Sequence, residues 1–511
     1  MTHMTSGSAT NSQVLIVGAG PTGLALALWL ARLGMRIRVI DKTADVAPIS
    51  RALGVHARTL EFYRQLGFAE AVVNAGVIVP SLNMWVRGRR VSSVPFASVG
   101  EGLTPFPFVL DFAQDEHERL LIARLREAGV MVERSTELTA FRADEQGVEA
   151  VLRTPDGGEE HCRCDYLAGC DGAHSTVRQL LNIDFAGGTY DHLFYVADVV
   201  ARGPAVGNGI HVDLDEADLL AIFDMKGNGH VRLVGTLPPE VVERRHEAAL
   251  TFDDVARRPI EQLHLEIERV NWFSTYRVHH RVANRFRVGR VFLLGDAAHV
   301  HSPVGAQGMN TGIGDAVNLA WKLAAVSKGE MRESVLDTYE SERIAFARRL
   351  VSTTDRAFAF ASQSGRIAAL VRTRLFPGAV TALFRFKAMR RFLFRTVSQI
   401  EIKYRHSTLS RGRAGAIHGG DRLPWFDDNF TPLTSLRWQV HVYGDASDAL
   451  RGRCRELGLA LSVFAWRPEM QRAGFHRNAL YLVRPDGYVA FADGSDISGR
   501  GLATYVATLH I

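Results

Sequence analysis

Cysteine is scarce in this sequence, which contains only Cys162, Cys164, Cys170 and Cys454 among its 511 residues. The first three are spaced C-x-C-x5-C, and no further Cys or His follows at the spacing of a zinc finger. No zinc site or other metal site is therefore expected. We interpret the four cysteines as reduced thiols of a cytoplasmic protein.

Long apolar runs are also missing. Nowhere do about 18 apolar residues follow one another, so no membrane span is expected. The first residues, MTHMTSGSATNSQ, are polar and lack the apolar segment of a signal peptide. Charge of one sign is not in large excess either, because 60 Lys and Arg stand against 55 Asp and Glu. A net charge of +5 over this length does not favour nucleic acid as a partner.

The composition that remains is typical of a globular protein with several domains. Hydrophobic residues make up 47% and charged residues 23% of the chain, which are ordinary values. A chain of this length exceeds a single hydrophobic core, so roughly two to four domains are expected. Basic and apolar residues are mixed between Arg366 and Arg413, a pattern that fits either ordinary amphipathic helices or a membrane-surface helix. We favour the ordinary helices.

A strand, a tight turn, a helix and a second strand are predicted between Gln13 and Asp41. The apolar run QVLIV leads into GAGPTG, which comprises Gly18, Ala19, Gly20, Pro21, Thr22 and Gly23. In this motif the first glycine permits the turn, the second lets a pyrophosphate approach the backbone, and the third allows close packing of helix and strand. Asp41 ends the second strand, where an acidic residue accepts hydrogen bonds from a ribose. The unit predicts a dinucleotide site.

Two later segments repeat this logic. Residues 166–178, YLAGCDGAHSTVR, form an apolar strand that ends at Asp171-Gly172 before a Ser/Thr-capped helix start. The run Val291–Leu294 stops at Gly295-Asp296, and a loop and a long helical pattern follow. Ligands of open α/β sheets bind at the carboxyl ends of the strands. The three turns are therefore expected to converge on one extended ligand.

This ordered set resembles the FAD-dependent aromatic hydroxylases, the single-component flavoprotein monooxygenases that include phenol hydroxylases and polyketide ring hydroxylases. The resemblance covers most of the chain. Besides the three turns, it rests on SRALGVHARTLEFYRQLG at 50–67, QDEHERLL at 114–121, YESER at 339–343, SQIEIKYRHS at 398–407 and GDRLP at 420–424.

The resemblance implies an α/β fold. A Rossmann-like FAD-binding domain would comprise residues 13–82, 107–188 and 281–345, and a substrate-binding sheet domain would be inserted as residues 83–106 and 189–280. A helical connection, 346–410, would lead to a thioredoxin-like domain at 411–511. That last domain contains only Cys454, so it would lack a C-x-x-C redox pair and act structurally. A homodimer is the assembly that the family implies.

By the same resemblance, Asp296 would bind the ribityl chain of FAD, with Gly295 allowing the approach and Pro303 beside the reactive face of the flavin. Gly308 and Met309 would direct backbone N–H groups at flavin N1 and O2, where a helix N-terminus stabilises negative charge. Arg51, which could equally form a surface ion pair, would meet the pyrophosphate, and Gln114 the ribityl or adenosine side. Asp171 and Arg178 would lie where phosphates and the nicotinamide are handled. Lys42 and Asn310 complete the expected cofactor set, whereas His299 and His301 are expected to be structural.

The implied reaction uses NADPH or NADH to reduce FAD, which then reacts with O2 to a C4a-hydroperoxide that hydroxylates an aromatic ring. The single GxGxxG favours a nicotinamide that docks transiently. A base near the substrate hydroxyl would help, and His211 and Tyr195 are the first candidates, together with His230, Tyr276 and His56. The sequence does not select among them.

Two alternatives stay open at this point. Baeyer–Villiger or epoxidising chemistry on a polycyclic substrate would use the same scaffold, and a flavin-binding protein without turnover would need no substrate at all. Halogenation is disfavoured because no Trp has another Trp two positions away, as the W-x-W-x-I-P motif of the tryptophan halogenases requires.

Overall fold

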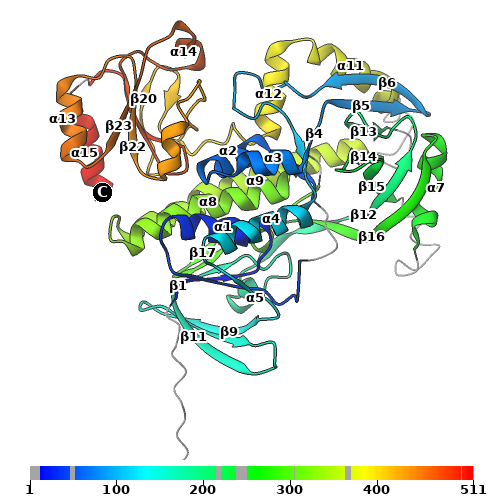
Figure 1. Cartoon of the computed structure of the whole chain (residues 1–511), viewed down its shortest axis with the longest axis horizontal. Helices are drawn as coiled ribbons and strands as arrows, with labels where there is room; N and C mark the ends of the chain where they lie inside the picture. The colour runs from blue at the N-terminus through cyan, green and yellow to red at the C-terminus, as the bar shows by residue number, and fades with distance from the viewer. Residues whose placement is uncertain are drawn as a thin grey trace, which may run out of the picture.

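The computed structural model describes residues 12–46, 52–214, 220–237, 250–303, 305–362, 370–496 and 498–509. It contains three main sheets with helices packed between and around them (Figure 1). Within the described residues, no helix is both long and apolar enough to cross a membrane. The same residues contain no cluster of three or more His, Cys, Asp or Glu that could hold a metal ion.

The first sheet is a parallel sheet with a short antiparallel extension. Its main order is β17 (Arg287–Val288), β18 (Val291–Leu293), β11 (Glu159–Gly169), β1 (Ser12–Val17), β2 (Ile37–Ile40) and β8 (Val132–Glu133). All neighbours from β18 to β8 pair in parallel. The hairpin of β9 (Glu137–Ala143) and β10 (Val148–Arg153) continues from β11. Parallel strands are buried on both faces, which explains the unbroken apolar runs of β1 and β18.

Helices cover the first sheet and bury its apolar residues. Helix α1 (Pro21–Arg32) packs against α4 (Gln114–Glu127) and α8 (Gln307–Ser327), and the three lie together in Figure 1. Every residue of α1 from Gly23 to Leu30 is buried, because the sheet lies on one side of it and α8 on another. That double cover accounts for the almost wholly apolar sequence LALALWL.

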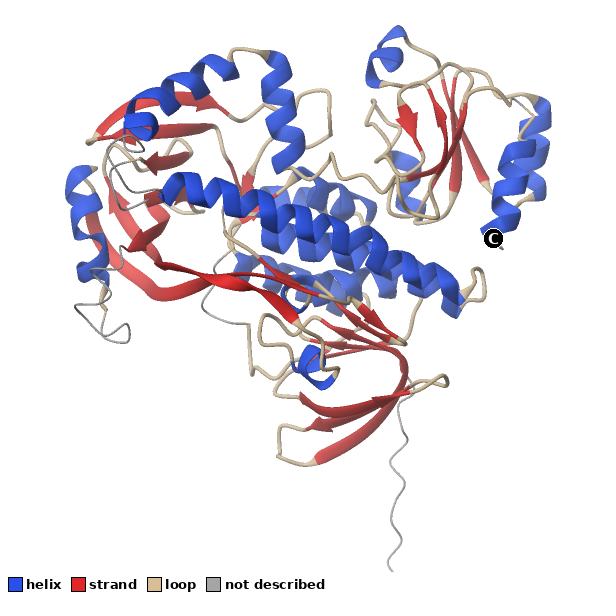
Figure 2. Cartoon of the chain, turned by 180° about the vertical axis from the view of Figure 1, so that it is seen from behind, coloured by secondary structure: helices blue, strands red, loops and turns tan. Residues whose placement is uncertain are grey.

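The second sheet is mostly antiparallel. Its order is β19 (His299–Val300), β16 (Glu266–Ala283), β12 (Phe185–Arg202), β15 (His230–Leu237), β14 (Leu220–Asp224), β13 (Ile210–Asp213), β5 (Ser81–Val86) and β6 (Arg89–Pro95). Strands β12 and β16 are the longest described, and Figure 2 shows them running continuously from this sheet towards the first. Helix α7 (Phe252–Gln262) packs on one face. We call that face outer, and the opposite face inner.

The third sheet belongs to the last hundred residues. Its order is β21 (Ile417–His418), β20 (Arg411–Ala414), β25 (Val489–Asp493), β24 (Leu480–Val483), β22 (Gln439–Tyr443) and β23 (Ala460–Phe464). Helices α13 (Asp448–Glu456), α14 (Pro468–Ala473) and α15 (Arg500–Leu509) accompany it. Each face of the sheet has its own apolar core, so this part of the chain is a small α/β layer of its own.

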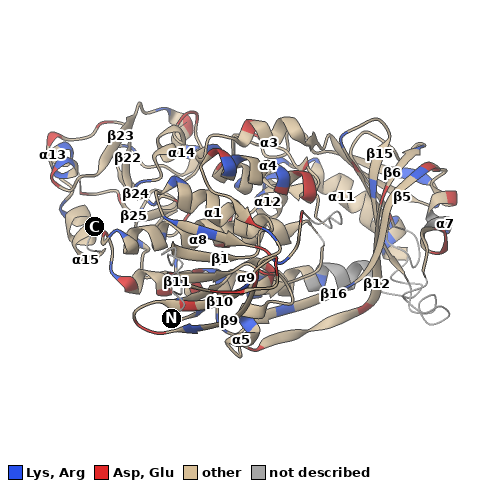
Figure 3. Cartoon of the chain, turned by 60° about the horizontal axis from the view of Figure 1, so that its bottom comes forward, with Lys and Arg blue, Asp and Glu red and all other residues tan. Residues whose placement is uncertain are grey.

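Shorter elements connect the sheets. A three-stranded sheet joins β3 (Gly54–Val55), β7 (Leu110–Asp111) and β4 (Val77–Ile78). The helical elements are α2 (Ala57–Gln65), α3 (Ala69–Ala75), α5 (Thr176–Leu180), η2 (Gly295–Ala297), η3 (Glu333–Leu336), α9 (Asp337–Ser362), η4 (Val371–Leu375), α11 (Phe376–Phe384), α12 (Lys387–Val397) and η5 (Thr431–Ser435). Acidic and basic residues are interspersed over the molecule (Figure 3).

Candidate functional site

The carboxyl ends of four neighbouring strands meet at one edge of the first sheet. Backbone hydrogen bonds continue past the strand ends: Gly18 N donates to Ile40 O at 2.8 Å, Cys170 N to Val17 O at 2.7 Å, and Leu294 N to Gly169 O at 3.0 Å. The turns that follow β1, β11 and β18 therefore lie side by side. This is the convergence that the sequence predicts for GxGxxG, DG and GD.

The three glycines of the first turn are required for different reasons. Gly18 has a φ of +104°, and a Cβ there would lie 2.3 Å from Cys170 O. A Cβ on Gly23 would lie 2.0 Å from Gly18 O, whereas one on Gly20 would have no atom within 4 Å. The protein itself thus needs Gly18 and Gly23. Gly20 faces open space at the N-terminus of α1, where Pro21 begins the helix without a side-chain cap, and this suits a phosphate group.

This contrast gives a prediction. Gly20 has a φ of −75° and a ψ of −179°, so alanine should change the free energy of unfolding by less than about 0.5 kcal/mol. The affinity of the apoprotein for FAD should nevertheless fall by about tenfold or more, because the methyl group occupies the approach of the pyrophosphate. Gly23→Ala is the matched variant and should lose about 1–3 kcal/mol of stability. Urea unfolding and flavin fluorescence titration measure the two quantities, and unchanged FAD affinity in Gly20→Ala would argue against a phosphate at this turn.

Asp41 fixes the same turn from the end of β2. Its Oδ2 accepts a hydrogen bond from Ala19 N at 2.7 Å, and its Oδ1 accepts from the backbone N and the hydroxyl of Thr43 at 2.8 and 2.6 Å. The carboxylate is only partly buried, and Oδ2, which accepts a single hydrogen bond, keeps a lone pair for a further donor. Lys42, next to it, is exposed.

The first and third turns pack directly on each other through small residues. A Cβ on Gly295 would lie 2.6 Å from the Thr22 hydroxyl, and one on Gly312 of α8 would lie 2.2 Å from the same oxygen. Only glycine at both positions lets Thr22 of α1 fit between η2 and α8. Thr22 is thus a packing residue, and the contact joins the N-termini of α1 and α8 to the GD turn.

Asp171 of the second turn has an unsatisfied oxygen. Its Oδ2 accepts from Val177 N at 3.1 Å, whereas Oδ1 is buried without a hydrogen-bond partner among the described residues. Burial raises the pKa of this carboxyl, against the hydrogen bonds from Ser175 and backbone groups. A buried acceptor without a donor is costly, so this oxygen fits a ligand that brings a hydroxyl or N–H group.

Arg178, expected near the phosphates and nicotinamide, is engaged elsewhere. Its guanidinium donates to Ala297 O at 2.9 Å and to Ala173 O at 2.8 Å, and it lies 3.9 Å from the centre of the Phe185 ring. It ties the second turn to the third, and its role in the structure is to position them.

Asp296 is the exposed residue of an otherwise buried segment. Residues 291–295 and 297–299 are buried, and the Asp296 side chain alone points outward. Behind it, Gly295 N donates to Asp315 Oδ2 at 3.0 Å, and His299 Nε2 contacts the same oxygen at 2.7 Å. His299 is therefore structural, in agreement with the sequence analysis.

A loop with a left-handed residue leads into α8. Ala306 has a φ of +52°, and α8 begins after it without a side-chain cap, so the backbone N–H groups of Gly308 and Met309 in the first turn have no intrahelical acceptor. Pro303 is exposed at the start of the loop. The buried ring of His56 contacts Gly305 O at 2.9 Å, and burial lowers the pKa of His56 to about 4. His56 is thus a neutral support of the loop.

Asn310 and Gln114 also serve as supports. The Asn310 amide donates to Gly54 O and Ala306 O at 2.9 Å each, and its oxygen accepts from His56 N and the Thr59 hydroxyl. Its side chain is fully used by these contacts with the protein, and its expected place in the cofactor site stays a prediction. Gln114 Oε1 accepts from Ala52 N at 3.4 Å, beside Arg51, which lies outside the described residues.

His211 and Tyr195 are the first two candidate bases that the sequence offers. Both lie on the outer face of the second sheet, in or beside the core beneath α7. His211 Nδ1 accepts from Trp85 Nε1 at 2.9 Å, and its Nε2 therefore donates to Gly207 O at 2.7 Å. The inner face is marked by Arg232, which donates to Ala52 O at 3.1 Å. The sequence-based choice of these two residues is corrected for this reason.

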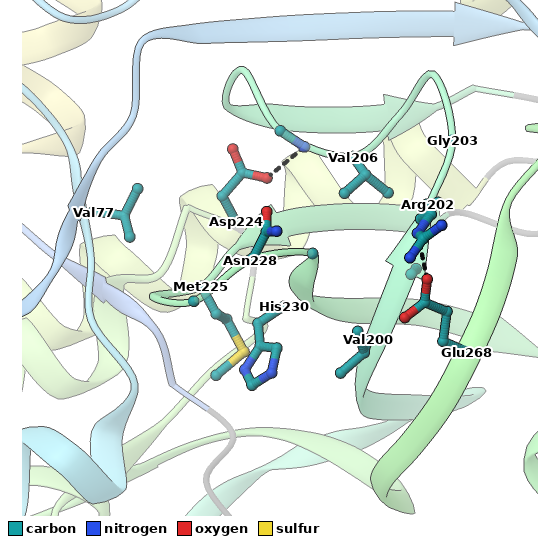
Figure 4. A pocket seen from close by; sticks show the side chains of 14 residues that line it. Val77, Val200, Arg202, Gly203, Val206, Asp224, Met225, Asn228, His230 and Glu268 are labelled. Carbon is teal, nitrogen blue, oxygen red and sulfur yellow. Dashed lines mark hydrogen bonds and ion pairs between the residues drawn. The ribbon is translucent and has the colours of Figure 1, made fainter.

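Among the other candidates, Tyr276 lies on the inner face. It pairs with Phe194, and the two ring centres are 5.7 Å apart. His230 lines a cavity of about 590 Å³ at the end of β12, together with Asp224, Met225, Asn228 and Val77 of β4 (Figure 4). A cavity of this size can hold a drug-sized molecule.

Asp111 is a candidate site residue that the sequence motifs do not indicate. It pairs with Gly54 on one side and with Val77 on the other, and a Cβ on Gly54 would lie 2.7 Å from Ala306 Cβ. Asp111 is thus one strand away from the α8 loop and one strand away from the cavity wall. Its Oδ2 is buried without a partner among the described residues. Burial raises the pKa of Asp111 well above its usual range, the charge of Asp224 raises it further, and Arg232 opposes this.

These features suit FAD. The open approach at Gly20 and the uncapped start of α1 fit a pyrophosphate, the free oxygen of Asp171 and the exposed Asp296 fit hydroxyl groups, and the uncapped start of α8 fits the electron-rich edge of a flavin ring. All of them lie along one edge of the first sheet and its flanking helices.

Comparison with known proteins also indicates an FAD-binding protein. Residues 11–354 match the family described as FAD binding domain. The chain is 32% identical to the 6-methylpretetramide 4-monooxygenase of Streptomyces rimosus, with 98% of this chain and 94% of that protein covered. The solved structure of the OxyS anhydrotetracycline hydroxylase from Streptomyces rimosus is 28% identical, with a TM-score of 0.76 and coverage of 98% and 99%. That of aklavinone-11 hydroxylase with FAD and aklavinone is 26% identical, with a TM-score of 0.77 and the same coverage. The chain therefore belongs to the FAD-dependent aromatic hydroxylases and is an FAD-dependent monooxygenase.

Proposed function

We propose that this monooxygenase hydroxylates a phenolic or polyketide-type aromatic ring, using NAD(P)H and O2. The observation that carries the proposal is the placement of three distant turns along one sheet edge, next to the uncapped N-terminus of α8. The names of the relatives point to the substrate class, since they act on pretetramide, anhydrotetracycline and aklavinone rings. A cytoplasmic location, where NAD(P)H is available, is part of the same proposal.

The cofactor-binding roles follow from the geometry. Gly20 and the start of α1 would hold the pyrophosphate, Asp41 the adenosine ribose, and Asp171 and Asp296 hydroxyl groups of the ribose or ribityl chain. Gly308 and Met309 would donate to the flavin N1 and O2 edge. When bound, FAD supplies the acceptor for hydride and the centre that activates O2. The protein supplies orientation and a helix dipole that needs no proton.

The substrate hydroxyl is assigned to Asp111. This carboxyl lies between the α8 loop and the wall of the cavity, and its raised pKa makes it a neutral acid over a wider range of pH than an ordinary Asp. A neutral acid can donate a hydrogen bond to a phenol oxygen and exchange a proton with it as the ring becomes more nucleophilic. The inner face of the second sheet, with Phe194 and Tyr276, would face the ring itself.

A prediction follows for Asp111→Asn. Asparagine keeps the shape and the hydrogen-bonding ability of the neutral acid but cannot exchange a proton, so kcat/KM should fall by about 100-fold. FAD affinity and the melting temperature should change little. The pH profile gives the sharper readout, because the alkaline loss of activity that belongs to Asp111 should disappear in the variant. Glu268→Gln, on the rim of the same cavity, should keep kcat/KM within about threefold. Full activity of Asp111→Asn across the pH range would overturn the assignment.

The overall reaction has a direct test. Simple phenols and polycyclic quinones should be screened for substrate-stimulated NAD(P)H oxidation with matching O2 uptake. A product with one added oxygen and an intact ring supports hydroxylation. Ring expansion or an epoxide would support the Baeyer–Villiger or epoxidising alternative, and no stimulated oxidation with any compound would favour a flavin-binding protein without turnover.

We further propose that residues 411–511 are a thioredoxin-like domain without redox function. The order β25-β24-β22-β23, with β22 and β23 parallel and the others antiparallel, is the βαβ–ββα arrangement of such a domain. Helix α13 connects the parallel pair, and α15 follows β25. Cys454 is buried, and burial raises the pKa of its thiol to about 11. A neutral, buried, single thiol is unsuited to redox exchange.

A further inference from the structure

Exposed apolar side chains are concentrated on one helical segment outside the site. Among the described residues, twelve large hydrophobic side chains are exposed, and five of them lie between residues 370 and 392: Leu370, Leu375, Leu383, Phe386 and Phe392. The two phenylalanines are the most exposed of all twelve, at 65% and 63%. We call the outward side of η4, α11 and α12 the α11–α12 surface. A concentration of this kind marks an interaction site.

Helix α11 is apolar on both of its sides. Its inward side packs on the core through Phe376, Val380 and Phe384, and the Phe384 ring stacks on Phe96 with the ring centres 5.8 Å apart. Its outward side carries Ala379, Ala382 and Leu383, and Leu375 comes directly before the helix; all four are exposed. These four residues lie three or four positions apart, so they share one side of the helix. Phe386 follows in the extended link between α11 and α12. The inward contacts therefore do not account for the apolar character of the outward side.

The charges around these apolar residues have one sign. Arg374, Arg385, Lys387 and Arg395 are exposed, and none of them forms an ion pair with another described residue. The sequence has no Asp or Glu between Arg356 and Ile400. From the neighbouring loop, Glu101 meets the segment through its backbone oxygen, to which Arg391 donates at 3.2 Å. The cations therefore lack acidic partners within the described part of the molecule.

The exposed apolar residues of this segment reverse the preference for ordinary helices that its sequence suggests. We propose that the α11–α12 surface binds the surface of an anionic lipid bilayer. A helix that lies in the plane of a membrane presents Phe and Leu to the acyl region and Lys and Arg to the phosphates, which is the arrangement seen here. A second copy of the chain fits less well, because a two-fold contact brings the same cations face to face. The proposal concerns reversible surface binding, since no described helix spans a membrane.

Vesicle co-sedimentation of the FAD-loaded full chain tests this. Vesicles of phosphatidylcholine with 30% phosphatidylglycerol should bind the protein at low salt. The affinity for vesicles of phosphatidylcholine alone should be lower by about tenfold or more. Phe386→Ser with Phe392→Ser should weaken binding about tenfold or more without reducing FAD content. Lys387→Glu with Arg395→Glu should do the same and remove the salt dependence.

Matched controls separate this surface from the rest of the molecule. Arg451→Glu with Arg455→Glu, on the exposed side of α13, and Met131→Ser, at another exposed apolar position, should leave vesicle binding unchanged. Equal binding to neutral vesicles, no binding to either kind, or equal loss in the controls would overturn the proposal. So would a dimer in sedimentation velocity that dissociates on Phe386→Ser, because the occupant would then be a second copy.

Discussion

Asp296→Ala should be purified as a colourless apoprotein. The Asp296 side chain is exposed within a buried segment, so its removal leaves the packing of η2 and the hydrogen bond from Gly295 to Asp315 intact. We propose that the lost carboxylate accepts charge-assisted hydrogen bonds from ribityl hydroxyls, and two such bonds are worth about 3 kcal/mol or more. We therefore expect the dissociation constant of FAD to rise by about 100-fold or more, as measured by flavin fluorescence titration of apoprotein.

The stability of the apoprotein separates this result from misfolding. The melting temperatures of Asp296→Ala and wild-type apoprotein should agree within about 1 °C, because less than about 0.5 kcal/mol is at stake at an exposed position. Asp445→Ala, an exposed acid in the third-sheet region, should keep full FAD content. Retention of yellow colour and of wild-type affinity in Asp296→Ala would show that another residue holds the ribityl chain.

Arg484→Ala should have the largest effect on stability. Arg484 is fully buried and contacts Glu342 at 2.7 Å and Asp486 at 2.5 Å. Its removal leaves two buried carboxylates short of a counter-charge, which costs about 3 kcal/mol or more. Urea unfolding should show this loss. Arg477→Ala removes an exposed arginine that pairs with Asp445 at 3.7 Å and should cost less than about 1 kcal/mol. Equal losses in the free energy of unfolding in the two variants would contradict the large contribution expected of the buried ion pairs.

The dependence of this contribution on pH has a definite sign. Burial alone would raise the pKa of Glu342, but Arg484 and then Lys322 hold it well below its usual range. The folded state therefore binds fewer protons than the unfolded state, whose Glu has a pKa of about 4.3. The stabilisation is complete above that value and is lost as the pH falls below it. The stability of Arg484→Ala should accordingly fall less steeply with acid than that of the wild type.

The edge of the first sheet that would bind the cofactor could be predicted from the sequence, because each of its turns is encoded by neighbouring residues. A strand, a glycine and an acid within a few residues identify each turn, and parallel strands place their carboxyl ends at the same edge. The substrate side could not be predicted in this way. Whether Tyr195 or Phe194 faces the first sheet depends on the register of β12, and a shift of one residue reverses every side chain. Residue type alone suggests His211 and Tyr195, and the pairing of the strands puts both on the outer face.

Asp111 and Asp315 show a second limit. Asp111 interrupts the apolar run Phe108–Phe112, and a lone acid in such a run is a local signal of a buried carboxylate. Asp315 lies inside helix α8, where nothing local marks it, yet it accepts hydrogen bonds from Gly295 and from Arg343, 28 residues away. The residues that hold the GD turn in place are thus distant from it in the sequence. The motif shows Gly295 and Asp296 but not the Asp315 and Arg343 side chains behind them.

The junction of the third-sheet region with the rest of the molecule restricts how the chain can diverge. Glu61 pairs with Arg422 as well as with the nearby Arg58, and Glu342 pairs with Arg484 as well as with Lys322. Each acid therefore depends in part on a base supplied much later in the sequence. A hybrid that takes its last hundred residues from a relative should lose stability unless both partners of each ion pair are present. Substitutions at these paired positions in the two regions must therefore occur together, although each region has an apolar core of its own.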